Sequence, residues 1–267
     1  KPGDMVILSS SPVPGNELTV SNVVNQLVEK GAVRLDGYIN QFGTVQMGRL
    51  ADGIQGVYID ALKDANTTIT ELVYWDHGRL NAPFYDTSKN ITSATARSSG
   101  MAARDIDADS RVEIPLCNRL PGYYETADPK ETMWLTGWYD WDYAAQTAKL
   151  KFNTVLNLAD GYYVRIDDSW KERFTTLYTE ADRTLWFKPM ENGQIGEPFM
   201  AVRIYKDNES VSEDPDKKFE PFGSSGHGSG MGYTESVQYA FWFDQDNAYG
   251  LTSREAVQVI VTRLLFQ

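Results

Sequence analysis

Cysteine and histidine are the residue types that this chain of 267 residues has least of. Cys117 is its one cysteine, which excludes an internal disulfide framework and a cysteine-based zinc cluster. Its position after the apolar residues 114–116 is typical of a small buried side chain. His77 and His227 are the two histidines, so few groups titrate near neutral pH. The sequence therefore offers little for nucleophilic or acid–base catalysis.

Positive charge and long apolar runs are also scarce. The chain has 25 Lys and Arg against 37 Asp and Glu, a net charge of −12. This charge opposes binding to nucleic acid and to anionic membrane surfaces, both of which depend on Lys and Arg. No run reaches the roughly 18 apolar residues of a membrane span; residues 256–266 are interrupted by Gln258, Thr262 and Arg263. We expect a soluble protein with no nucleic-acid partner and no membrane span.

The residues that are present describe an ordered, β-rich protein. Apolar residues make up 42% of the chain and charged residues 23%, which is ordinary globular composition. Aromatic residues make up 12%, with 15 Tyr and 7 Trp. Such side chains suit a pleated, half-buried surface and are equally suited to protein interfaces.

Short apolar segments separated by turn residues dominate the chain after residue 110. Their spacing predicts an antiparallel β-sandwich or jelly-roll-like domain over residues 111–267, because no helical patterns alternate with them. The expected strands are 111–117, 132–141, 148–158, 162–167, 174–179, 184–188, 199–205, 237–243 and 256–266.

The first 80 residues predict a smaller α/β portion. Apolar residues at helical spacing indicate helices over 21–30 and 53–65, and β-branched and aromatic residues favour strands over 33–39 and 67–75. The whole chain is thus a β-dominated α+β fold.

Two long segments carry no regular pattern. Residues 81–110 are rich in Ser, Thr, Ala and Arg, and predict a long loop or an extended arm. Residues 207–235 are charged and then glycine-rich, and predict a mobile loop. The glycines of 223–232 do not form a phosphate cradle, since a strand rather than a helix is expected to follow them.

Alternating carboxylates mark one candidate metal site. Asp105, Asp107 and Asp109 offer oxygen ligands from a short loop, which is what Ca²⁺ requires. The loop departs from an EF-hand because Ser110 stands at the glycine position and Leu116 at the bidentate glutamate position. A solvated acidic loop is the alternative, and no other cofactor is expected.

Tryptophans gather in one strand beside two acids. Trp134, Trp138 and Trp141 are interleaved with Asp140 and Asp142. Flat rings beside carboxylates can bind sugars, and paired carboxylates can hydrolyse a glycosidic bond. Adjacent-strand aromatics more often fill a core or a subunit interface, and that interpretation is favoured here.

Three function classes follow. The leading one is a non-enzymatic structural or assembly protein of a multi-subunit particle, best matched by a bacteriophage or viral virion component such as a capsid-associated, neck or tail protein. Its partners are then other protein subunits, in a homo-oligomer or a hetero-assembly. The alternatives are a carbohydrate-binding β-sandwich module and a secreted, carboxylate-based glycoside hydrolase. A virion or extracellular location is expected. The sequence begins at Lys1 instead of a methionine, so an upstream segment has been either cleaved off or left out of the numbering.

Overall fold

The computed structural model describes residues 41–86, 88–89, 91–98, 101–125, 132–206, 209, 211, 219–228 and 234–263. For residues 41, 42, 91, 224–228, 234–236 and 263 only the backbone is described. The predicted helix 21–30 and strand 33–39 lie outside these ranges. Within them, no helix has both the length and the apolar composition needed to cross a bilayer.

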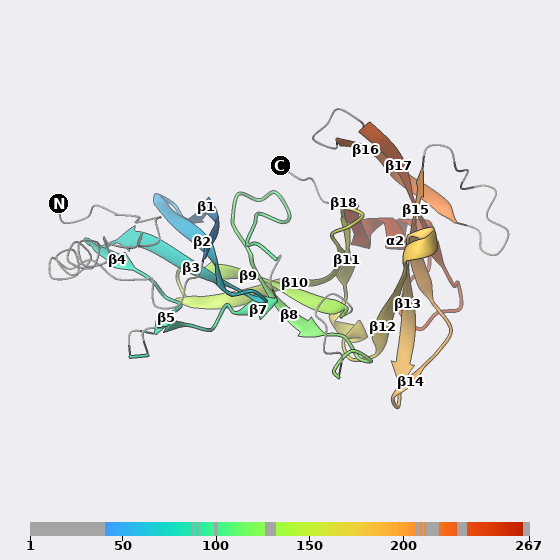
Figure 1. Ribbon diagram of the computed structural model, residues 1–267, viewed down its shortest axis with the longest axis horizontal. Coiled ribbons are helices and arrows are strands. Elements are labelled where there is room, and N and C mark those ends of the chain that lie inside the picture. Colours follow the sequence, from blue (N-terminus) through green and yellow to red (C-terminus); the bar gives the residue numbers. More distant parts are fainter. Residues whose placement is uncertain are drawn as a thin grey trace. The chain divides into compact units, whose positions relative to one another are not determined.

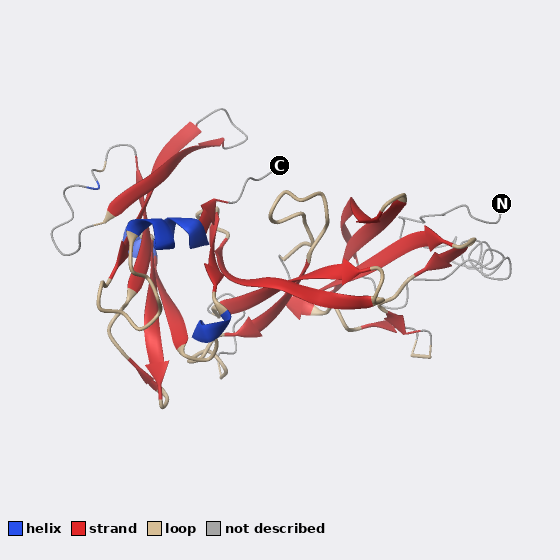
Figure 2. Ribbon diagram, turned by 180° about the vertical axis from the view of Figure 1, so that it is seen from behind, coloured by secondary structure: helices blue, strands red, loops and turns tan. Residues whose placement is uncertain are grey.

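The chain is mainly β and its sheets are antiparallel, as the sequence predicts (Figures 1 and 2). The first sheet has the order β1-β2-β3-β4, with β7 also paired to β3. The second has the order β18-β11-β10-β9-β8, and the third β12-β13-β15-β17-β16, with β14 paired to β13. A small fourth sheet joins β5 and β6.

The strand bounds are as follows. The first and fourth sheets contain β1 (Gln41–Ala51), β2 (Ile54–Asp64), β3 (Thr67–Asp76), β4 (Arg79–Asn81), β5 (Tyr85–Asp86), β6 (Ile91–Thr92) and β7 (Arg97–Ser98). The second contains β8 (Ile114–Arg119), β9 (Trp134–Asp142), β10 (Thr147–Asn157), β11 (Tyr162–Ile166) and β18 (Val261–Arg263). The third contains β12 (Phe174–Thr179), β13 (Thr184–Glu191), β14 (Gln194–Ile195), β15 (Met200–Lys206), β16 (Glu220–Gly228) and β17 (Thr234–Phe243).

The chain divides into two compact units. The first comprises Lys1–Cys117 and Gly137–Lys151, and the second comprises Asn118–Thr136 and Phe152–Gln267. The divisions fall within β8, β9 and β10, so each of these strands contributes residues to both units. These divisions differ from the expected boundaries near residues 80 and 110.

A hydrophobic core fills the first unit on one face of its sheet. Leu50, Tyr58, Leu72 and Tyr74 come from β1, β2 and β3, and pack with Trp141 and its neighbours. Gly48 is required on this face, because a Cβ there would lie 2.8 Å from Val112 Cγ2. Residue 112 can approach β1 this closely because residue 48 is a glycine and has no Cβ.

The predicted helix over 53–65 is wrong, because this segment is strand β2. Strand β2 pairs with β1 on one side and with β3 on the other. Its middle residues, Tyr58 to Ala61, are buried on both faces, so the sequence lacks the period-2 alternation of a half-buried strand. All of the described part of the expected α/β portion, residues 41–80, is β-structure and connecting turns.

The described part of residues 81–110, expected to form a long loop or an extended arm, contains short strands only, and Thr95, Arg97 and Ala103 bind β2 and β3. Arg97 is fully buried and its Nη2 donates to Asp60 Oδ1 at 2.8 Å. Arg97 also donates to the carbonyl oxygens of Thr95 and Met101. Asp60 in turn accepts from Thr44, Thr70 and the Ala103 amide. This hydrogen-bonded ion pair holds these residues against the first sheet.

The second unit is a β-sandwich, since residues of two sheets share one core. Val155, Tyr162 and Val164 come from the second sheet, and Phe187, Val202 and Phe241 are among those from the third. Alternation along the third sheet places Leu185 and Phe187 inside and Trp186 on the outer face.

An ion pair also secures a turn in this unit. Asp160 is buried after β10, and its carboxylate accepts from the Arg183 guanidinium, the Tyr178 hydroxyl and the Asn157 amide. The Tyr239 hydroxyl donates to the Asp160 carbonyl oxygen at 2.9 Å. The turn between β10 and β11 is thereby tied to the third sheet.

Two further sequence predictions are wrong in this unit. Residues 220–228, expected within a mobile loop, form β16, because pairing with β17 satisfies the backbone of a glycine-rich segment. Of residues 256–266, expected as one strand, the described part lies in helix α2 (Arg254–Ile260) up to residue 260 and in β18 over residues 261–263. Ser253 caps this helix by accepting from the Ala256 amide at 3.2 Å, a cap that the apolar pattern masked.

We expect Arg97→Met to lower the free energy of unfolding by about 3–5 kcal/mol, because it leaves a buried carboxylate without its cation. Chemical denaturation measures this loss. Lys89→Met is the matched control, since the Lys89–Asp86 pair is exposed and its removal should change stability little. Equal effects of the two substitutions would contradict the structural role assigned to Arg97.

Candidate functional site

The three predicted calcium ligands lie together in a loop that closes on itself. Carboxylate oxygens of Asp105, Asp107 and Asp109 all lie within 4.8 Å of one another. Asp105 accepts from the backbone amides of Asp109 and Ser110, at 3.1 and 2.8 Å. Ala108 and Ser110 have positive φ angles, so the loop turns back toward its first residue.

A lysine supplies the cation for this loop. Lys151 of β10 donates through Nζ to Asp107 at 2.8 Å, to Asp109 at 2.7 Å and to Glu113 at 3.0 Å. Glu113 is fully buried, and its second oxygen accepts from the Ile106 amide at 3.1 Å. The ammonium thus takes the position beside the carboxylates that an added ion would need, so Ca²⁺ binding would require its displacement.

The charges of this cluster depend on one another. Burial raises the pKa of Glu113 to about 7, against the opposing effect of the hydrogen bond from Lys151. Desolvation acts to raise the pKa of Asp109, yet hydrogen bonds from Lys151 and the Arg111 amide leave it below its ordinary value. Burial by itself would lower the pKa of Lys151, but its hydrogen bonds to Asp107, Asp109 and Glu113 hold it above its usual range. The sequence pattern located the acids but gave no sign of the lysine, which follows 38 residues after Glu113.

Two of the three candidate tryptophans belong to the core, which was the favoured interpretation. Trp138 and Trp141 are buried, at 1% and 4% exposure, so neither ring face is open to a sugar. Trp141 packs edge-to-face on Phe84 in the core of the first unit. Trp134 lies in the second unit, where the Arg119 guanidinium lies 5.8 Å from its ring centroid. Trp138 and Trp141 are therefore core residues.

The two acids proposed for glycoside hydrolysis are both engaged elsewhere. Asp140 accepts from the Arg111 guanidinium, and Asp142 accepts from the Ala145 amide in the turn after β9. His77 lies in the turn between β3 and β4, where its Nδ1 is 2.7 Å from the Asp76 carboxylate and its side chain is largely exposed. Asp140, Asp142 and His77 thus each contact another group of the protein in a way that stabilises the fold. The backbone of His227 belongs to β16.

Glu71 is the one buried carboxyl that lacks a partner among the described residues. Both of its carboxyl oxygens are without a hydrogen bond, and the residue is 2% exposed. It lies in β3 opposite Ile59 of β2, between the buried residues Ile69 and Val73. Burial raises its pKa to about 8, so the carboxyl is protonated at neutral pH.

The same face of the first sheet also carries exposed apolar side chains. Val45 and Met47 of β1 are 53% and 69% exposed, and Trp75 of β3 is 46% exposed. The strand register places all three on the Glu71 face. Val45 pairs with Ile59, which pairs with Glu71, and Met47 pairs with Val57, which pairs with Val73. Trp75 is two residues after Val73 on β3 and therefore lies on the same face. We call Val45, Met47 and Trp75 the Met47 surface. Exposed apolar groups on one sheet face are typical of a contact site.

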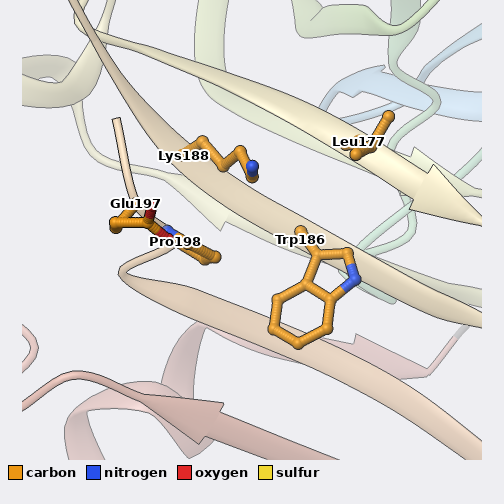
Figure 3. A pocket seen from close by; sticks show the side chains of 5 residues that line it. All are labelled: Leu177, Trp186, Lys188, Glu197 and Pro198. Atoms are coloured by element: carbon orange, nitrogen blue, oxygen red, sulfur yellow. The ribbon is translucent and has the colours of Figure 1, made fainter. Parts of the chain in front are cut away.

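A second surface feature lies on the outer face of the third sheet (Figure 3). Trp186 lines a shallow hollow of about 190 Å³ together with Leu177, Lys188, Glu197 and Pro198. Sequence reasoning did not select these residues. The alternation Leu185-Trp186-Phe187 in a predicted strand was the available signal, because it places one aromatic residue opposite to two core residues.

We expect Lys151→Met to destabilise the protein by about 1–3 kcal/mol, because three carboxylates lose their shared cation. Urea denaturation at pH 7 measures the loss, which should shrink at low pH as the carboxylates become protonated. Lys149→Met is the matched control, since Lys149 is exposed two residues away on the same strand. An unchanged midpoint for Lys151→Met would contradict the assigned role of the lysine.

We expect the free energy of unfolding to fall between about pH 5 and pH 8 because of Glu71. In this range the folded protein retains a proton that the unfolded chain releases, at a cost of up to about 1.4 kcal/mol per pH unit. Glu71→Gln should remove this part of the pH dependence and should stabilise the protein above pH 8. Glu180→Gln, at an exposed position, should leave the profile unchanged. Thermal unfolding across the pH range compares the three proteins.

Comparison with known proteins shows no family for this chain. No family model matches it, and no solved structure matches it. A stretch of 32 residues is 66% identical to ribonuclease J from Thermus thermophilus. That stretch covers 12% of this chain and 6% of the ribonuclease, so the similarity is confined to a short segment of both proteins.

Proposed function

We propose that this chain is a non-enzymatic structural protein that assembles with other protein subunits. The observation that carries the proposal is the Met47 surface, where three large apolar side chains are exposed on one face of a sheet. Such side chains gain free energy when another protein covers them, at about 25 cal/mol per Å² of buried apolar area.

The position of this surface supports an interface. Val45 and Met47 are two residues apart on β1, and Trp75 lies two strands away, at the end of β3. Strands in a sheet are about 4.8 Å apart, so the three side chains span a short distance over a rigid support. A Trp and a Met on such a support are typical interface anchors.

The use of the acidic groups agrees with this proposal. Asp60, Asp140 and Asp160 each accept hydrogen bonds from an arginine, and Glu113 accepts one from Lys151. In each case the charged pair joins segments that are distant in the sequence. These groups stabilise the fold, which is the role expected of them in a scaffold.

A bacteriophage or viral particle is the specific setting that we propose, with the chain as a capsid-associated, neck or tail component. Support for this setting comes from the sequence, namely the acidic composition and the many Tyr and Trp residues. The sandwich of the second unit is an architecture that presents open sheet faces to neighbours.

We expect the purified protein to self-associate. The double variant Val45→Glu, Met47→Glu should have a dissociation constant for self-association at least tenfold higher. Charged side chains on the Met47 surface would have to be desolvated in the interface. Sedimentation velocity over a concentration series measures the dissociation constants of the wild-type protein and of the double variant. Val259→Glu is the control, because Val259 is a single exposed apolar residue on α2.

Two outcomes would contradict the proposal. One is a strictly monomeric wild-type protein at the highest concentration that stays in solution. The other is equal weakening by the double variant and by Val259→Glu, since the association would then not involve the Met47 surface.

A further inference from the structure

The register of the third sheet places Trp186 in a row of side chains on its outer face. Leu177, Trp186, Ala201 and Trp242 form one row across β12, β13, β15 and β17. Ala201 is the smallest member of the row and lies between Trp186 and Trp242. Figure 3 shows Lys188 between Leu177 on one side and Pro198 and Glu197 on the other, with the Trp186 ring beside them.

Contacts behind the ring hold Trp186 in a fixed orientation. Trp242 meets it at 6.5 Å between ring centroids with an interplanar angle of 61°. Phe219 meets it edge-to-face at 6.4 Å. Because these aromatic contacts support the ring, little side-chain entropy would be lost when a ligand packs against it.

Two charged side chains at the border of the hollow are available to a ligand. In the described part of the chain, neither Lys188 nor Glu197 forms an ion pair or a side-chain hydrogen bond. One supplies hydrogen-bond donors and the other supplies acceptors. A ligand in the hollow would therefore meet an apolar ring, a donor and an acceptor within one small area.

This combination favours one ligand chemistry. The hollow is shallow and open, so both charges stay hydrated and an ion pair with a charged ligand would contribute little. Most of the binding free energy must come from contact with Trp186, Leu177 and Pro198. The ligand therefore needs a flat apolar face together with hydroxyl groups at its edge, which describes a pyranose ring.

We propose that this hollow binds a pyranose unit of a neutral glycan. The C–H face of the sugar packs on the indole of Trp186, and its hydroxyl groups donate to Glu197 and accept from Lys188. This site lies in the second unit, and it is independent of the Met47 surface and of the assembly role proposed above. It also differs from the tryptophans that the sequence selected, of which Trp138 and Trp141 are buried.

A glycan array followed by calorimetry with the best neutral oligosaccharide tests the proposal. Trp186→Ala should weaken binding at least tenfold, whereas Trp186→Tyr should retain most of it because a flat ring remains. Glu197→Ala and Lys188→Met should each weaken binding severalfold. Circular dichroism and thermal unfolding establish that each variant is folded.

Trp134→Ala is the matched control, because Trp134 is another partly exposed tryptophan of the second unit. It should bind as the wild-type protein does. A wild-type protein that binds no glycan on the array would overturn the proposal. So would a folded Trp186→Ala variant with unchanged affinity. Self-association of the same proteins is measured separately by sedimentation. A negative result for glycan binding therefore does not affect the test of the assembly proposal.

Discussion

Buried carboxylates set the main constraint on this structure, because each one needs a cation or several donors near it. Asp60 obtains them from Arg97, Thr44, Thr70 and the Ala103 amide. Glu113 is matched by Lys151, and Asp160 by Arg183. An unpaired buried charge is costly, so these contacts hold irregular segments such as 101–113 in one position. Glu71 meets the same constraint differently, by remaining protonated.

Much of the fold could be predicted from the sequence, and the exceptions have physical causes. Strand 174–179 was predicted with its observed bounds, since its turns and β-branched residues agree with its tertiary setting. Strand β2 was taken for a helix because burial on both faces removes the alternation of a strand. Helix α2 was taken for a strand, since its apolar residues merge with those of β18. Strand β16 was missed because glycine propensity is overridden by pairing with β17.

The surface features were harder to predict than the strands. Composition drew attention to Trp134, Trp138 and Trp141, although density of aromatics in a sequence does not distinguish core from surface. Trp186 is separated from the other tryptophans in the sequence, and its place on the outer face follows from the inward packing of Leu185 and Phe187. The acidic loop was found by its spacing, whereas its lysine comes from a distant strand. Long-range partners of this kind leave no local signal.

Strand β1 ends the first sheet in the described part of the chain, and its ladder with β2 is irregular. Its register shifts between Phe42 and Val45 and again between Arg49 and Ala51. Such irregularities twist an edge and hinder the regular backbone pairing through which sheets polymerise. Any contact that another molecule makes at this edge is therefore expected to involve side chains more than main-chain groups.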